Sequence, residues 1–506
     1  MFRLSILFTA ALVAWLAASA GGWAQNPVSA LAPAEPSQAA PDPNVPPTIE
    51  LTLAPAAEPR PALQYSLLPT EDERTPGNAA PHYYRAIVMQ QQLPKEHSQL
   101  YVDKYRLWEQ ATGADYPKEE VAKWLGAQEN ILKELRLAAH REYCDWDFRL
   151  QDLRGLEMLS FLLPEIQECR SLARTLRVKA RYEILDGRPK DALETLRIGY
   201  QLGRDSAQAS FLVSALVGVA ICNMMNEELL LLMRHSDQNY YWALAALPDP
   251  LIDLRPAMEF EMHFPQQMFP FLIDAETTHR SPDEWRRLIV ECMQGMGAMS
   301  GGANDSDGWY DELAVAAFMA KLYPAAKEAL IAGGMTRERV EAMPVAQVVA
   351  IQTARTSEYA FQEVFKVWLL PYPEASRRIP EIEQKLEDEG ILRLAAALSG
   401  KAGLPLASLL LPAVSQVMQA EVRLARNLAA LRAIEALRMH AAANGGKLPQ
   451  SLAEVTVVPV PENPATNQPF AYAYDAAAGT ATLEVPPIGG LPPQHDAKRY
   501  VIRLKK

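Results

Sequence analysis

Residues 180–199 read ARYEILDGRPKDALETLRIG, and this stretch indicates how the chain folds. Gly187 permits a tight turn, and Pro189 suits the first turn of a helix, where its missing N–H is not needed. The small side chains of Ala180 and Ala192 let two helices approach closely. The stretch therefore predicts a helical hairpin.

Helical signals continue on both sides of this hairpin. From about residue 63 to 445, apolar residues recur with helical spacing, whereas alternating strand patterns are missing. Ser281-Pro282-Asp283-Glu284 predicts a helix start with a capping box, and Thr336 predicts another start. A long helix is expected from about Leu406 to Ala442. Its apolar stripe comprises Leu424, Leu428, Leu431, Ile434 and Leu437.

The N-terminus differs from this helical body. Arg3, the apolar run Leu4–Ala18 and small residues up to Ala24 predict a signal peptide over residues 1–24. Residues 25–60 are rich in Ala and Pro and predict a linker. We therefore expect an exported protein of the periplasm or cell envelope.

The predicted fold is mainly α, with irregular antiparallel helical hairpins or a solenoid and a small α+β C-terminal tail. The two helical regions span residues 61–250 and 251–425, and the tail spans residues 426–506. A chain of 506 residues has room for several such regions and for a large buried core.

Charge and hydropathy argue against a nucleic-acid partner and against a membrane span in the mature chain. The chain carries 61 acidic and 49 basic side chains, and its net charge of −12 repels nucleic-acid phosphates. The apolar run Phe211–Cys222 is short and is followed by Asn223, so we expect no transmembrane segment in the mature chain. An envelope protein is therefore the expected partner, with the oligomeric state left open.

The four cysteines lack the short spacings of zinc sites and thioredoxin-type redox motifs. In an oxidising compartment they allow two disulfides in three connectivities. We favour pairing of Cys144 with Cys169, which flank a predicted hairpin. The alternative interpretation, a small buried apolar side chain, fits Cys222.

Two patches of the chain resemble known proteins. Ala180, Gly187, Ala192 and Leu196 match one helix-turn-helix of a tetratricopeptide repeat, although no second copy follows 34 residues away. Residues 61–86, with Thr75-Pro76-Gly77-Asn78, together with 240–256 resemble a set of exported planctomycete-type bacterial proteins. That resemblance implies export and helical character but no site residues.

The tail is similar to the soluble half of type II secretion major pseudopilins. A helix ending near Ala443 leads through Gly445-Gly446 into a proline-rich loop. Phe470, Tyr472 and Tyr474 then alternate on a first strand, and residues 480–485 form the second. The resemblance implies a helix packed on a short antiparallel sheet. It also implies, as an alternative function, an accessory factor of a secretion or pilus-like assembly.

Soft-metal ligands gather in one region of the sequence. Cys292, Met293, Met296 and Met299 lie at three-residue spacing, and His263 lies upstream. Sulfur and imidazole ligands suit copper(I), so this set is a candidate copper site. The same spacing also fits a buried helix face, in which methionine fills gaps.

No catalytic motif stands out in the sequence. The chain contains neither a Gly-x-Ser-x-Gly elbow nor a Walker loop, and we expect no cofactor. The sequence therefore favours a non-catalytic interaction or scaffold protein of the bacterial cell envelope. The two alternatives are the accessory factor and a copper-binding protein.

Overall fold

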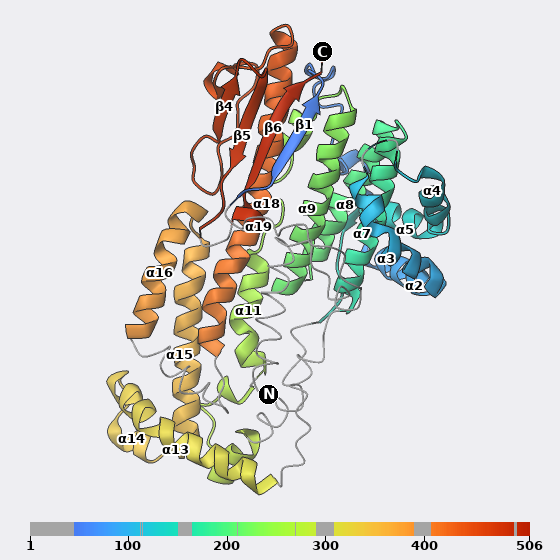
Figure 1. Ribbon diagram of the computed structural model, residues 1–506. Helices are drawn as coiled ribbons and strands as arrows, with labels where there is room; N and C mark the ends of the chain where they lie inside the picture. The colour runs from blue at the N-terminus through green and yellow to red at the C-terminus, as the bar shows by residue number, and fades with distance from the viewer. Residues whose placement is uncertain are drawn as a thin grey trace, which may run out of the picture. The chain divides into compact units, whose positions relative to one another are not determined.

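The computed structural model describes residues 45–111, 113, 115–149, 164–209, 211–268, 270–289, 308–388, 406–489 and 493–505. These residues belong to two compact units (Figure 1). One unit is built on Arg255–Met418, and the other combines the segments before residue 148, between 163 and 254, and after 418. The signal peptide and most of the predicted linker lie outside the described residues.

The unit built on Arg255–Met418 is helical. Its core gathers around Trp285, whose side chain is fully buried beside Leu330 and Val348. The predicted helix starts are confirmed here, because Glu284 N donates to Ser281 Oγ and Arg339 N donates to Thr336 Oγ1 (both 3.3 Å). The helices are α11 (Arg255–Met268), α13 (Gly308–Ala332), α14 (Arg337–Glu341), α15 (Val345–Trp368) and α16 (Tyr372–Asp388).

The other unit joins a helical layer to a sheet. The long helix predicted in the tail is confirmed as α18 (Leu406–Ala443), which contributes its residues from Gln419 to this unit. The remaining helices are α2 (Ala80–Gln91), α3 (Lys95–Gln110), α4 (Lys118–Gly126), α5 (Glu129–Ala139), α7 (Pro164–Leu185), α8 (Pro189–Ala207), α9 (Leu212–His235), α10 (Tyr241–Ala245) and α19 (Pro493–Asp496).

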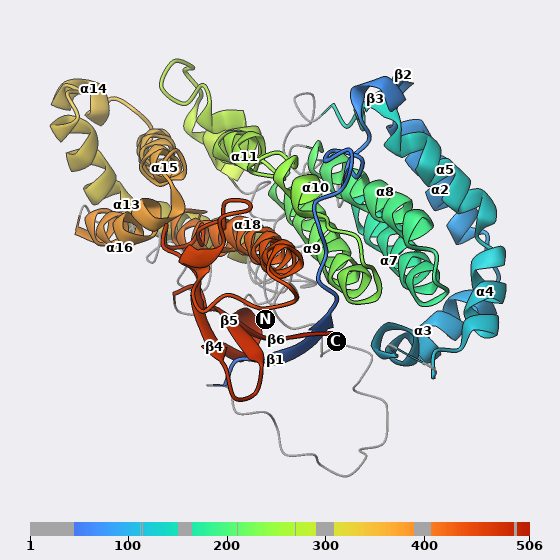
Figure 2. The same ribbon diagram turned by 90° about the horizontal axis from the view of Figure 1, so that it is seen from above.

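Helices α7, α8 and α9 lie side by side in this unit (Figure 2). The predicted hairpin is confirmed: α7 ends at Leu185, Gly187 has a φ of 74° and α8 begins at Pro189. Close packing of α8 on α9 depends on glycine. A Cβ added at Gly218 would lie 2.4 Å from the carbonyl oxygen of Gly203, so the two backbones touch directly.

Helix α9 is long and apolar enough to cross a membrane by length and composition. It continues past Asn223, where the sequence suggested an interruption, to His235. Most of its apolar stretch is buried in the unit, where α7 and α8 pack against it. Within the described residues, its apolar character is accounted for by this packing.

The sheet contains four strands in the order β1-β6-β5-β4. Strands β4, β5 and β6 form an antiparallel meander, as the sequence predicted for its first two strands. One face carries the buried side chains Leu483, Tyr500 and Ile502, and the opposite face is partly exposed. The strands are β1 (Thr48–Leu53), β4 (Ala471–Asp475), β5 (Thr480–Val485) and β6 (Lys498–Leu504).

Strand β1 is the main departure from the predicted organisation. The linker prediction for residues 25–60 is wrong for Thr48–Leu53, which pair in parallel with Arg499–Leu504 of β6. Leu51 and Leu53 are buried while Glu50 and Thr52 are exposed, so the segment has the alternation of a half-buried strand. The tail is therefore completed by the N-terminal segment.

The fold class is confirmed as mainly α with a small C-terminal α+β region. The domain organisation differs, because the first helical region and the tail share one compact unit. Hydrogen bonds join them: Asn427 Nδ2 donates to Asn223 Oδ1 (2.9 Å), and Asn239 Nδ2 donates to the Glu435 carbonyl (3.0 Å).

Candidate functional site

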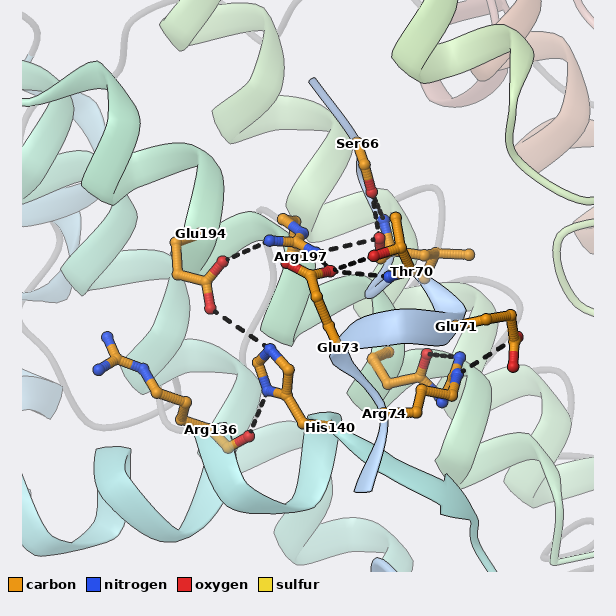
Figure 3. A network of polar contacts seen from close by, with 11 residues as sticks. Ser66, Thr70, Glu71, Glu73, Arg74, Arg136, His140, Glu194 and Arg197 are labelled. Atoms are coloured by element: carbon orange, nitrogen blue, oxygen red, sulfur yellow. Dashed lines mark hydrogen bonds and ion pairs between the residues drawn. The ribbon is translucent and has the colours of Figure 1, made fainter. Parts of the chain in front are cut away.

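The segment that resembles exported planctomycete-type proteins packs against α5 and α8 and forms a polar network (Figure 3). We call this set the loop network. It comprises Ser66, Thr70, Glu71, Glu73, Arg74, His140, Glu194 and Arg197. The loop network includes the part of the chain between Ser66 and the strand β2 (Thr75–Asn78), which pairs with β3 (Arg141–Tyr143).

Arg197 is the centre of the loop network. It extends from α8 and binds Glu73 directly, Glu194 at 2.9 Å and the Leu68 carbonyl at 3.4 Å. Burial alone would raise the pKa of Glu73, but hydrogen bonds from Arg197 and Thr70 lower this pKa to about 2. Glu73 is therefore ionised at physiological pH and holds the loop against α8.

Arg74 leads from the loop network to the interior. Its guanidinium donates to the Arg141 carbonyl at 2.8 Å and to Gln201 Oε1 at 3.4 Å. Gln201 in turn donates from Nε2 to Asp205 Oδ1 at 2.7 Å. A continuous series of polar contacts thus connects the partly exposed loop with a buried carboxyl group on α8.

Asp205 is surrounded by the residues that we call the Asp205 cluster. Tyr83 on α2 donates from its hydroxyl to Asp205 Oδ2 at 2.6 Å, and Trp146 Nε1 donates to the Asp205 carbonyl at 2.8 Å. The Tyr83 and Trp146 rings stack with 5.6 Å between centroids. The cluster comprises Tyr83, Cys144, Trp146, Cys169, Gln201, Asp205 and Ser206.

The electrostatics of the cluster are set by burial. Burial raises the pKa of Asp205 to about 6, although hydrogen bonds from Tyr83 and Gln201 act in the opposite direction. The same burial raises the pKa of the Tyr83 hydroxyl well above its usual value. Asp205 therefore changes its charge near neutral pH inside the protein.

Both ring nitrogens of His82 on α2 are engaged. Nδ1 lies 2.7 Å from Glu134 Oε2, and Nε2 accepts hydrogen bonds from Arg141 Nε at 3.2 Å and Nη2 at 2.9 Å. A nitrogen that accepts from a guanidinium carries no proton, so Nδ1 carries it and donates to Glu134. Because its lone pair is occupied, His82 serves to join α2, α5 and β3.

Of the predicted copper ligands, only His263 lies among the described residues. Cys292, Met293, Met296 and Met299 lie outside the described residues. His263 lies on the exposed side of α11, and its Nδ1 donates to the Glu259 carbonyl at 2.9 Å. Among the residues described, no group of three His, Cys, Asp or Glu side chains is arranged to hold a metal ion.

Sequence reasoning missed a set of buried ion pairs in the same unit. Arg177 and Arg181 on α7 both bind Glu228 on α9, at 3.0 Å and 2.9 Å. Arg426 on α18 binds Asp496 at 2.9 Å, and both side chains are fully buried. The signal available in the sequence was the placement of charged residues on otherwise apolar helix faces.

Asp496 is held ionised by its neighbours. Burial would raise its pKa, but Arg426 and Arg423 lower the pKa overall. Asp496 also accepts a hydrogen bond from the backbone N–H of Ile488 at 2.5 Å. This carboxylate thus fixes the segment before β6 against α18.

No model of a known family, no curated protein and no solved structure matches this chain.

The loop network and the Asp205 cluster can act chemically in two ways. They hold several segments of the chain together through hydrogen bonds, many of them charge-assisted, and they place two thiols beside a carboxyl group whose pKa is raised to about 6. The first property includes the partly exposed loop on α8, and the second belongs to the buried residues contributed by α2, α7 and α8.

Proposed function

We propose that this chain is an exported, non-catalytic protein of the bacterial cell envelope that binds a protein partner. The observation that carries the proposal is that buried arginines and carboxylates of the sheet-containing unit pair with one another. Glu228 is bound by two arginines, Asp496 by two arginines and Glu435 by Arg438. Buried charges paired in this way stabilise the packing of helices, and pairing leaves them poorly placed to act on a substrate.

Rigidity supports the same function. Buried ion pairs specify one arrangement of helices, and the glycine contact between α8 and α9 leaves little room for repacking. A rigid body loses little conformational entropy when it binds, so it suits a binding scaffold. The sequence supplies the location, through the predicted signal peptide at residues 1–24.

One observation favours a second candidate, an accessory factor of a secretion or pilus-like assembly. Helix α18 leads through a proline-rich loop into the meander β4-β5-β6, which is the order expected from the resemblance to pseudopilins. Strand β1 lies beside β6 and covers the edge that a three-stranded meander would expose. With this edge covered, the sheet cannot extend by adding a further strand beside β6, so the tail suits a domain that docks on an assembly through another surface.

Crosslinking in the native envelope tests both candidates. The full chain with its own signal is crosslinked in cells, and bound proteins are identified by mass spectrometry against a mock control. We expect one specific envelope protein; recovery of pseudopilins supports the second candidate. Recovery of no specific protein contradicts both.

Two charge reversals locate the binding surface. Arg503 is exposed on the sheet and Lys133 is exposed on α5, and each is replaced by Glu in a separate variant. Loss of the crosslink only with Arg503→Glu assigns binding to the tail. Loss only with Lys133→Glu assigns it to the helical layer.

A further inference from the structure

Two cysteines of the Asp205 cluster sit at the junction of three chain segments. Cys144 directly follows β3 and is partly exposed, and Cys169 lies on α7 with its side chain fully buried. Both are free thiols in the structure.

The segment around Cys144 is fixed on both sides. Ala79 N donates to the Tyr143 carbonyl at 2.9 Å, and Asp145 N donates to Asn78 Oδ1 at 2.9 Å. One residue further, Trp146 Nε1 donates to the Asp205 carbonyl at 2.8 Å. The backbone on either side of Cys144 is therefore anchored to β2 and α8.

Cys169 is anchored to the same turn of α8. Its sulfur hydrogen-bonds to the Ser206 hydroxyl, which in turn donates to the Leu202 carbonyl at 2.7 Å. Ser206 directly follows Asp205, the residue whose carbonyl holds Trp146. Trp146, two residues after Cys144, and the sulfur of Cys169 are thus hydrogen-bonded to consecutive residues of α8.

The two sulfurs and the Asp205 carboxyl group lie close enough to influence one another's pKa values. Burial raises the pKa of Cys144, and Asp205 and Cys169 raise it further. Burial also raises the pKa of Cys169, to about 12, although the hydrogen bond with Ser206 lowers it. Both sulfurs also raise the pKa of the Tyr83 hydroxyl, which donates a hydrogen bond to Asp205.

We propose that Cys144 and Cys169 are a redox pair that closes to an intramolecular disulfide when the chain meets a disulfide donor. In the cell this inference rests on the proposed export, because such donors act outside the cytoplasm. The bond joins the segment after β3 to α7 and encloses residues 145–168 in a loop. It fixes Trp146 over Asp205.

The reaction is a two-step thiol–disulfide exchange. Cys144, the more accessible sulfur, loses its proton and attacks the donor disulfide, which releases one donor thiol and forms a mixed disulfide. Cys169 then loses its proton and displaces the second donor sulfur. Two electrons pass to the donor, which leaves as two thiols, and the protein gains one S–S bond.

The raised thiol pKa values set the rate of this exchange. Both sulfurs remain protonated near neutral pH, so attack is slow unless the pH is raised. Cys222 provides a matched control, because it is also buried but lies on α9 against Gly203. Its Sγ is 4.0 Å from the Tyr200 carbonyl oxygen and belongs to a separate environment.

The test uses the purified exported chain equilibrated with oxidised and reduced glutathione at several ratios. After quenching by alkylation and digestion with trypsin without reduction, we expect peptides 142–149 and 155–170 joined by one disulfide and Cys222 alkylated. Cys169→Ser is expected to leave Cys144 as a stable mixed disulfide with glutathione. Cys222→Ser is expected to retain the Cys144–Cys169 bond.

The inference is overturned if Cys144 and Cys169 are both alkylated at every ratio, or if Cys144 pairs with Cys292. Thermal unfolding supplies a second measurement, since oxidation should raise the melting temperature of the wild type but not of Cys144→Ser. A bond that forms with glutathione but is absent from the protein isolated from cells contradicts export and leaves the redox pair intact. A chain recovered from the envelope in which Cys144 and Cys169 stay unpaired, both in cells and with glutathione, contradicts the pair and leaves export intact.

Discussion

Arg438 Nε donates a hydrogen bond of 2.9 Å to the carbonyl oxygen of Ala54, across 384 positions of the chain. The same guanidinium binds Glu435 at 2.7 Å and the Ser236 carbonyl at 2.7 Å. Ala56 N returns a hydrogen bond of 3.2 Å to the Arg438 carbonyl. One buried arginine on α18 therefore joins the segment after β1, the end of α9 and the tail.

Replacing Arg438 with Leu should destabilise the protein by about 3–5 kcal/mol, because Glu435 would remain buried without its partner. Chemical denaturation measures this change. Glu484→Gln removes an ion pair with Arg499 whose side chains are both over 40 % exposed, and it should cost less than about 1 kcal/mol. Equal effects of the two variants would contradict the assigned role of Arg438.

Strand β1 should contribute strongly to stability through its buried face. Leu53→Ala removes a side chain that is 0 % exposed and should cost about 2–5 kcal/mol of the free energy of unfolding. Thr52→Ala, on the exposed face of the same strand, should change it by less than about 0.5 kcal/mol. If Leu53→Ala behaves like Thr52→Ala, the pairing of β1 with β6 is wrong.

Gly218→Ala should disturb the contact between α8 and α9. The new Cβ would lie 2.4 Å from the backbone oxygen of Gly203, so the helices must separate at a cost of about 1–3 kcal/mol. Gly126→Ala near the end of α4 meets no atom within 4 Å and should be neutral or slightly stabilising. Thermal unfolding measures both variants. A Gly218→Ala protein with the melting temperature of the wild type would contradict the direct backbone contact between α8 and α9.

Asp205 should make stability depend on pH. Its folded pKa of about 6 lies above the ordinary value of 3.8, so its favourable contribution is complete below pH 4. That contribution is lost as the pH rises through 6, and the shift corresponds to about 3 kcal/mol. Asp205→Asn remains neutral at every pH, and the Tyr83 hydroxyl can reverse to accept from its amide.

The measurement compares the free energy of unfolding of the wild type and Asp205→Asn between pH 4 and 8. The wild type should lose stability relative to the variant across this range. Glu435 also has a raised pKa, but it titrates in both proteins and cancels in the comparison. If the free energies of unfolding of the two proteins change with pH in parallel, Asp205 does not have the raised pKa that its burial implies.

Local patterns predicted much of the fold. The helical hairpin at Gly187 and Pro189, the start at Ser281 and the strand at Thr480–Val485 each depend on nearby residues, so their patterns survive in the sequence. Helix α18 was predicted to within one residue at its C-terminal end, because Gly445 and Gly446 mark its termination with positive φ angles.

Strand β1 was missed although its sequence alternates. Ile49, Leu51 and Leu53 share one face, but the surrounding proline-rich composition suggested a linker. Its partner β6 lies at the other end of the chain, and no local signal identifies a partner so distant. The Asp205 cluster was missed for the same reason, since Tyr83, Trp146 and Asp205 come together only in the tertiary structure.

The central claim, an exported protein that binds an envelope partner, is tested most directly by comparing crosslinked products of two chains in the native host. One is the full chain, and the other lacks residues 1–24. The account predicts that the full chain is recovered from the envelope without residues 1–24 and bound to a specific protein, and that the shortened chain recovers no such protein. Recovery of the same protein with both chains, or retention of the full chain in the cytoplasm, would contradict it.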